Sequence, residues 1–352
     1  MSGYAFEAAA NYGNLPNGVF SPTMFSKKVQ KAFRKKAVVE AVTNSDYFGE
    51  IKNMGDSVKI IKEPEITITA YARGTQLTPQ DLIDSDFTLI VDRANSFMFR
   101  IDDIEKSQTH INWMDLASDR AAYRMADKHD KDVLAYMTGY EYSDSTGLWT
   151  ARTAAVGTAA DANAGSDELL SANKITRATF VSGGSSSESL AVGVAGTYDV
   201  TPLALLNRMS RKLDEYNVPK EDSWVILDPV FVELLMDENS KLINNDYNPG
   251  ADQLTNGRLA ERQIRGFTVY QSNNLPQVGT GAGTSDTNGS SAHYGVIVAG
   301  HKSAIATAQQ LNKVEDYRDP FSFADIVRGM HMYGRKILRP EAIVRAWYNV
   351  NA

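Results

Sequence analysis

The sequence contains no cysteine among its 352 residues. This absence excludes disulfides, thiolate nucleophiles, iron–sulfur clusters and cysteine-ligated zinc. The five histidines are scattered, with no HExxH motif, and the phosphate-binding GxxxxGK[ST] and nucleophilic GxSxG motifs are also missing. The residue chemistry therefore indicates a structural or interaction protein, and we expect no catalytic residue, bound metal or cofactor.

Long apolar runs are also missing. The apolar run at 294–299 is far shorter than the roughly 20 residues that a membrane helix needs. The first residues lack the basic and apolar regions of a secretory signal, so we expect a protein made and used without export or membrane contact. Acidic residues outnumber basic ones by 43 to 36, which argues against nucleic-acid binding driven by bulk charge. Apolar residues make up 43% of the chain, enough for a core in roughly two domains.

Positive charge is concentrated in one short segment that follows an irregular arm at 1–25. Within 26–36, Phe33 and Val29 continue a spacing of four from Phe25, which predicts a short amphipathic helix. The segment could contact an acidic partner or a nucleic-acid interior, or it could dock its apolar stripe on a neighbouring element. Its six basic residues are Lys27, Lys28, Lys31, Arg34, Lys35 and Lys36.

From residue 57 the pattern changes to a period of two. Ile66, Ile68 and Ala70 alternate with polar residues, which predicts a strand with one buried face. Further strands are predicted at 87–91 and 97–101, and a polar tip is predicted around Arg73. Such a hairpin is too long and too sparsely apolar to be stable alone, so it needs another surface to lie on.

A helical period governs residues 108–139, which predicts a helix on the order of 45 Å long. Gly139 is its expected end, and Met125 and Met137 are expected to be packed core residues. Residues 143–200 are rich in Ala, Gly, Ser and Thr and are expected to form a surface-exposed insertion with a few weak strands. The chain then predicts helices at 202–218 and 230–236, strands at 224–227, 267–271 and 294–299, and alternation from Phe323 onward.

The order of these elements, together with several short stretches, resembles the tailed-phage major capsid proteins, whose fold is called HK97-like. The most telling stretch is GFTVYQSNNLP at 266–276. No single stretch is a strict motif, and the agreement lies in order and spacing over roughly residues 20–350. The other similar stretches lie at 55–60, 99–103, 120–122, 130–134, 216–219, 224–229, 329–334 and 339–340.

The resemblance implies an α+β fold with an N-terminal arm, an extended β-hairpin loop (the E-loop), a peripheral domain with a long spine helix, and an axial domain. The segment 143–200 fits this pattern least well. The implied divisions are the arm at 1–47, the extended loop and flanking strands at 48–100, the peripheral domain at 101–200 with its spine helix at 108–139, the axial domain at 201–311, and the C-terminal return to the peripheral domain at 312–352.

The implied function is mechanical: copies of the chain form the pentamers and hexamers of an icosahedral shell around double-stranded DNA. Implied partners are further copies of the chain, a separate scaffolding protein, a portal, a decoration protein, and packaged DNA through weak contact. The implied location is the virion capsid, assembled in the bacterial cytoplasm. Candidate intersubunit contacts are Lys59, Lys62, Arg73 and Gln76, and the six basic residues of 27–36 are candidates for a basic arm on the inner surface.

Two other functions stay open from the sequence. An encapsulin, the shell protein of a cellular compartment, would have the same fold. A metal-dependent hydrolase would draw its ligands from distant positions in the chain.

Overall fold

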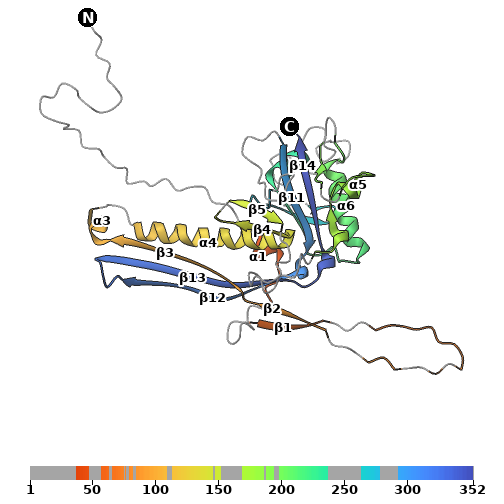
Figure 1. The fold of residues 1–352 in the computed structure, drawn as a ribbon, viewed down its shortest axis with the longest axis horizontal. Coiled ribbons are helices and arrows are strands. Elements are labelled where there is room, and N and C mark those ends of the chain that lie inside the picture. Colours follow the sequence, from red (N-terminus) through yellow and green to blue (C-terminus); the bar gives the residue numbers. More distant parts are fainter. Residues whose placement is uncertain are drawn as a thin grey trace, which may run out of the picture.

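The computed structural model describes residues 37–46, 57–62, 66–74, 76, 79–81, 85–108, 113–145, 147–151, 169–185, 188–193, 198–236, 263–277 and 292–351. Three parts are plain in Figure 1: a long helix lying on a long sheet, an α/β region at one end of that helix, and a hairpin that projects away from both.

The long sheet is antiparallel and has three strands in the order β12-β13-β3. These are β12 (Ile305–Arg318), β13 (Ala324–Ile337) and β3 (Arg93–Asp102). Burial alternates along β3, as expected when one face of a strand is covered and the other meets solvent. The predicted strand at 97–101 is therefore confirmed as part of β3, whereas β12 was not predicted.

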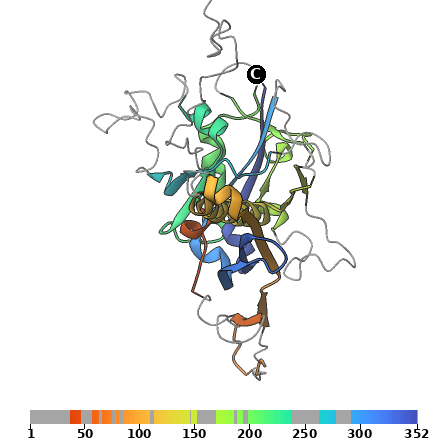
Figure 2. The same ribbon diagram turned by 90° about the vertical axis from the view of Figure 1, so that its left-hand side faces the viewer.

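The long helix α4 (Trp113–Thr138) lies over this sheet, with the short helix α3 (Asp103–Gln108) before it. Figure 2 shows α4 nearly end-on above the strands. Its 26 residues give a length of about 39 Å, slightly less than predicted. The chain turns at Gly139, where φ is 75°. Met137 is fully buried as expected, but Met125 is only partly buried because the first half of α4 is covered on one side only.

The α/β region is built on a seven-stranded mixed sheet. Its order is β6-β14-β11-β8-β10-β9, and β7 also pairs with β14. The strands predicted at 224–227, 267–271 and 294–299 are confirmed as parts of β8, β10 and β11. The bounds are β6 (Lys174–Ile175), β7 (Leu190–Ala191), β8 (Ser223–Leu227), β9 (Gln263–Ile264), β10 (Phe267–Gln271), β11 (Ala292–His301) and β14 (Ile343–Asn351).

Both faces of this sheet are buried, so β8 is apolar at almost every position. Val225 and Leu227 point into a core with the helices α6 (Pro202–Glu215) and α7 (Pro229–Leu235). Trp224 and Ile226 point to the other side, where the buried end of α4 and the short helix α1 (Val39–Val42) pack. Both α6 and α7 begin with a side-chain cap followed by proline.

The expectation that 143–200 is a surface-exposed insertion is wrong for part of the described residues between 169 and 200, although the weak strands expected there are present as β6 and β7. Ile175 and Leu190 are fully buried in the core beneath α6, because β6 and β7 pair with β14. Strands from before residue 200 and after residue 312 thus share one sheet with those between. Smaller elements complete the chain: β4 (Tyr140–Ser143), β5 (Leu148–Ala151), α5 (Arg177–Phe180) and the 3₁₀ turns η1 (Ser171–Asn173), η2 (Lys302–Ala304) and η3 (Pro340–Ala342).

The projecting hairpin starts from the antiparallel pair β1 (Ser57–Lys62) and β2 (Ser85–Ile90). Where β2 ends, the chain crosses β13 at Gly334: a Cβ on this residue would lie 2.3 Å from the carbonyl oxygen of Ile90. Only glycine therefore allows the close approach. Leu89 is buried at this crossing, between the hairpin and the long sheet.

The buried strand face predicted around Ile66 and Ile68 is wrong for the isolated chain. Residues 66–72 belong to no strand, and the exposed fractions of Ile66 and Ile68 are 65% and 94%. Apolar and polar residues alternate here as in a strand, but no part of the described chain covers the apolar side chains.

Candidate assembly surfaces

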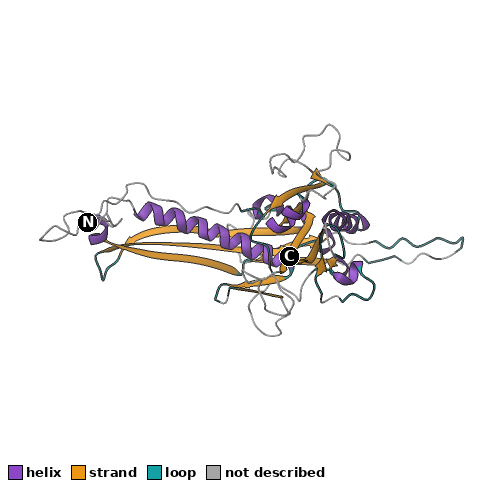
Figure 3. Ribbon diagram, turned by 90° about the horizontal axis from the view of Figure 1, so that it is seen from above, coloured by secondary structure: helices purple, strands orange, loops and turns teal. Residues whose placement is uncertain are grey.

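The projecting hairpin carries an unusual amount of exposed apolar surface. Ile61, Ile66 and Ile68 are exposed by 65% or more, and Tyr71 is also exposed. Folding of a single chain gains nothing from these side chains, whereas burial of an isoleucine elsewhere is worth roughly 1.5–3 kcal/mol. Figure 3 shows the projection extending well clear of the rest of the molecule. Several exposed apolar side chains on one projection are typical of an interaction surface.

The predicted contact residues lie on this projection, but they do not form one cluster. Lys59 lies near its base with an exposed side chain, and Lys62 is the last residue of β1. Arg73 lies in the turn at the tip beside Gly74, whose φ is 91°. Gln76, just beyond the turn, is exposed as well. The six basic candidates of 27–36 lie outside the described residues.

A second exposed apolar group lies at the far end of the long sheet, and the sequence analysis missed it. Phe321 and Phe323, in the turn between β12 and β13, are 96% and 79% exposed. Ile104 on α3 is exposed at the same end of the sheet. Met98 on β3 and Val314 on β12 are also exposed, further along the sheet and on its two opposite faces. The sequence feature that could have indicated this surface is the pair of phenylalanines next to a proline in an otherwise polar turn.

Ion pairs surround this second surface. Arg318 pairs with Asp103 and Asp325, which joins α3 to the sheet and raises the pKa of the Arg318 guanidinium. Arg328 pairs with Glu315 across β12 and β13, and Lys313 also lies against this carboxyl. The hydrogen bonds from Lys313 and Arg328 lower the pKa of Glu315. These pairs are solvent-exposed, so they fix geometry more than they stabilise the fold.

Asp130 on α4 connects the root of the N-terminal arm with the α/β region. Its fully buried carboxylate accepts hydrogen bonds from the backbone N–H groups of Val38 and Val39, at 2.7 and 3.0 Å. The side chain of Asn274, in the loop after β10, donates to Asp130 at 2.9 Å and to Asp127 at 3.0 Å. Burial raises the pKa of Asp130. Asn274 belongs to the stretch 266–276 singled out in the sequence.

A cluster of buried polar side chains connects α4 with β13. The rings of His129 and His331 lie 5.3 Å apart, and Tyr333 packs edge-on to His129 at 4.6 Å. Asp132 accepts a hydrogen bond from the Tyr333 hydroxyl at 3.0 Å and pairs with Arg335 at 3.2 Å. Burial lowers the pKa of His129 to about 4, helped by the charges of His331 and Arg335, and burial also lowers the pKa of His331.

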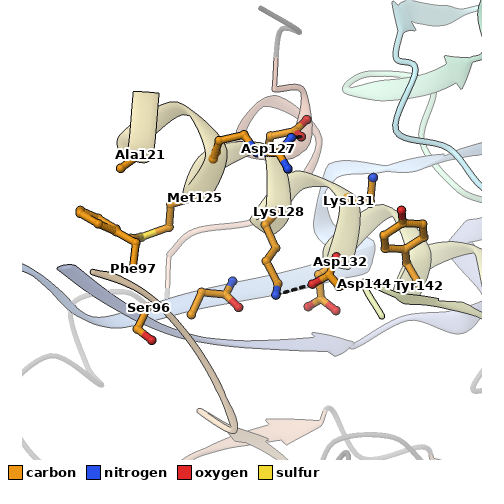
Figure 4. Close-up of a pocket in the computed structure, with 12 residues that line it drawn as sticks. Ser96, Phe97, Ala121, Met125, Asp127, Lys128, Lys131, Asp132, Tyr142 and Asp144 are labelled. Carbon is orange, nitrogen blue, oxygen red and sulfur yellow. Dashed lines mark ion pairs between the residues drawn. The ribbon is translucent and has the colours of Figure 1, made fainter. Parts of the chain in front are cut away.

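One flank of α4 borders a charged cavity of about 460 Å³ (Figure 4). Lys128 forms an ion pair with Asp144 at 2.5 Å across it, and the Lys131 ammonium lies 4.0 Å from the centre of the Tyr142 ring. These contacts connect α4 to β4 and the turn after it. Arg124 also pairs with Asp127 on this flank, so most of the charged side chains around the cavity contact a partner within the chain and hold α4 in place.

Two classes of site are not found in the part of the chain that the structure covers. There, no group of three or more His, Cys, Asp or Glu side chains is arranged to hold a metal ion. Likewise, none of the described helices combines the length and apolar character that crossing a membrane requires.

No known family model matches the sequence, and no curated protein matches it either. Comparison with solved structures is decisive for the fold. A structure from Mycobacterium phage Che8 aligns over 94% of this chain and 98% of its own, with a TM-score of 0.67 and 22% identity. The capsid asymmetric unit of cyanophage Pam1 covers 100% of both chains, with a TM-score of 0.65 and 12% identity.

The chain has the HK97-like capsid fold. The capsid of Ralstonia phage GP4 agrees, with a TM-score of 0.63, 12% identity, and coverage of 100% of this chain and 98% of its own. In terms of the capsid fold, α4 is the spine helix and the β1–β2 projection is the extended loop. The fold predicted from the order of elements is confirmed.

Proposed function

We propose that the chain is the major capsid protein of a tailed phage, which assembles through pentamers and hexamers into an icosahedral shell around double-stranded DNA. The observation that carries the proposal is the projecting hairpin with its exposed isoleucines, on a chain whose whole length follows the capsid fold. Such a projection gains its stabilising contacts only from a neighbouring copy.

In this proposal the projection lies across an adjacent subunit. Ile66 and Ile68 are buried there, and Lys59, Lys62, Arg73 and Gln76 fix its position through polar contacts. Rim charges of this kind set register and specificity more than affinity. The α/β region is the axial domain at the centre of each capsomer, and α4 with the long sheet is the peripheral domain.

The further partners follow from the same role. A separate scaffolding protein, a portal and a decoration protein are proposed partners, and the virion capsid, assembled in the bacterial cytoplasm, is the proposed location. The net charge of -7 is compatible with weak contact with packaged DNA, because a container should not bind its genome tightly over its whole inner wall. The role proposed is structural, without catalysis.

Electron microscopy of the purified protein, with and without a co-expressed scaffold, tests the proposal directly. Closed shells or regular capsomers are the expected result. A monodisperse monomer under all assembly conditions would contradict it. An encapsulin would instead close without a scaffold and retain a protein cargo, so co-purifying cargo in closed particles would favour that function.

A further inference from the structure

The flank of α4 opposite the charged cavity forms a groove of about 500 Å³. It lies between α4, the start of α1 and the long sheet. Part of its wall is apolar, from Val39, Met125 and Ala126, and two exposed acids, Glu40 and Asp119, lie along its edge. The cavity on the other flank differs, because lysines and arginine line it together with acids.

A buried polar atom in this groove lacks a partner. His129 is only 7% exposed and lines the groove, and its Nε2 atom has no hydrogen-bond partner within the described residues. Leaving such a group unsatisfied costs roughly 1–3 kcal/mol. A polypeptide segment that enters the groove would exclude water from its apolar wall and could supply the missing hydrogen bond.

The chain itself leads into this groove. Ala37, the first residue described, lines it, and the next two residues are fixed to α4 through the hydrogen bonds of Val38 and Val39 to Asp130. A segment that ends at Ala37 therefore needs no linker to reach the groove. The residues immediately before Ala37 are also the segment that carries the chain's concentrated positive charge.

This segment matches the groove in length and in chemistry. On α4 the groove extends from Asp130 back to Ser118, and 25–36 would cover a similar length of about 18 Å as a helix. Phe25, Val29 and Phe33 share one face of such a helix. Most of its six basic residues fall on the opposite side, and the acidic edge of the groove carries the complementary charge.

We propose that residues 25–36 dock as an amphipathic helix along this flank of α4 in their own chain. The apolar stripe enters the groove, and the basic side chains face its acidic edge and the surroundings. The proposal concerns the fold of the subunit and does not depend on its role in a shell. It also leaves the basic face available for weak contact with DNA.

The absence of cysteine makes a disulfide test clean. Val38 contacts Asp130, which fixes the register between the docked segment and α4. If the two run parallel, counting back nine residues from each places Val29 beside Ala121 and its neighbour Ala122. Ala122 lines the groove, whereas Ala121 lines the cavity on the opposite flank. The test is the full-length double variant Val29→Cys/Ala122→Cys, with Val29→Cys/Ala121→Cys as the matched control.

After mild oxidation, peptide mass spectrometry on a mixture of isotope-labelled and unlabelled protein separates links within a chain from links between chains. We expect an intrachain disulfide in the 29/122 variant, formed in several-fold higher yield than in the 29/121 control. Equal yields would overturn the proposal. A purely interchain disulfide would also overturn it, because the segment would then occupy the groove of a sister molecule.

A second substitution tests the apolar stripe. Adding Phe33→Ser to the 29/122 variant is expected to lower the disulfide yield several-fold, and adding Gln30→Ser is expected to leave it unchanged. If the Phe33→Ser variant cross-links as well as its parent, the stripe does not hold the segment in the groove, and the proposed mode of docking is wrong.

Discussion

Single residues connect parts of this molecule that are distant in sequence, and Asp130 is the clearest example. One carboxylate satisfies two backbone donors of the arm root and the side chain of Asn274 in the α/β region. Asp130 is fully buried, so water does not replace its carboxylate as the acceptor for the N–H groups of Val38 and Val39, whereas Asn274 also donates to Asp127. Loss of the carboxylate therefore affects three segments at once.

We predict that Asp130→Ala lowers the free energy of unfolding by about 2–4 kcal/mol, because buried donors lose their acceptor. Chemical denaturation of the subunit measures this. Asp115→Ala, at an exposed position of the same helix, is the control and should change stability by at most about 0.5 kcal/mol. Similar losses in both variants would contradict the prediction.

The histidine pair makes stability depend on pH. Because the native pKa of His129 is about 4, against an ordinary value of 6.5, only the unfolded chain takes up a proton readily between these values. Stability from this group is complete above pH 6.5 and is lost as the pH falls below it. By pH 5 the loss is on the order of 2 kcal/mol.

The measurement is the change in unfolding free energy between pH 7.5 and pH 5 for the wild type and for His129→Gln. Carboxylates titrate in both proteins, so the difference isolates the histidine. A smaller loss in His129→Gln is expected. Parallel pH profiles would show that His129 is accessible to protons in the native state.

At the scale of elements, the exposed side chains of the hairpin should matter for the proposed assembly and not for the stability of the subunit. Ile68 is 94% exposed, so Ile68→Ser should change the stability of the isolated subunit by at most about 0.5 kcal/mol. In an assembled shell the same side chain is buried against a neighbour in our proposal. We therefore predict that Ile68→Ser leaves the subunit folded but strongly reduces the yield of closed particles.

Circular dichroism and electron microscopy provide the two readings for this variant. Leu89→Ser is the matched control on the same hairpin, because Leu89 is fully buried within its own chain. It should lower subunit stability by several kcal/mol, in the range of about 2–5 kcal/mol for a buried leucine reduced to a small residue. Normal particle yield from Ile68→Ser would contradict the proposed contact.

Elements with a clear period could be predicted from the sequence, and their partners could not. The long helix, α6 and the strand β8 follow their apolar patterns closely. Residues 66–70 have the same alternation as a buried strand, because the pattern shows that one face is to be covered and not which chain covers it. The strands β6 and β7 are two residues long and are defined only by pairing with distant β14.

The position of the projecting hairpin could be predicted, whereas the second exposed apolar group could not. The hairpin and its tip could be located because the polar stretch around Arg73 interrupts two apolar strands. The exposed Phe321 and Phe323 could not, since exposure depends on the turn between β12 and β13, and β12 itself was not predicted. The contact of Asp130 with the arm root spans 92 residues and leaves no local pattern.

At the scale of the whole molecule, the proposed assembly would make stability depend on neighbouring copies. The hairpin and the far end of the long sheet expose apolar side chains that a second copy could bury. We predict that the melting temperature rises with protein concentration under assembly conditions, because association stabilises the folded state by mass action. Scanning calorimetry over a hundredfold range of concentration measures this, and a constant melting temperature would contradict it.

The crossing at Gly334 determines where the projection points. The backbone of Ile90 rests directly on this residue, and the tip at Gly74 lies twelve residues beyond the end of β1, at most about 40 Å away. Gly334 is thus the point of β13 that supports the base of the projection. A methyl group on Gly334 would push the Ile90 backbone away from β13. In the proposed shell, the direction in which the projection meets a neighbouring copy therefore depends on the lack of a side chain at this one position.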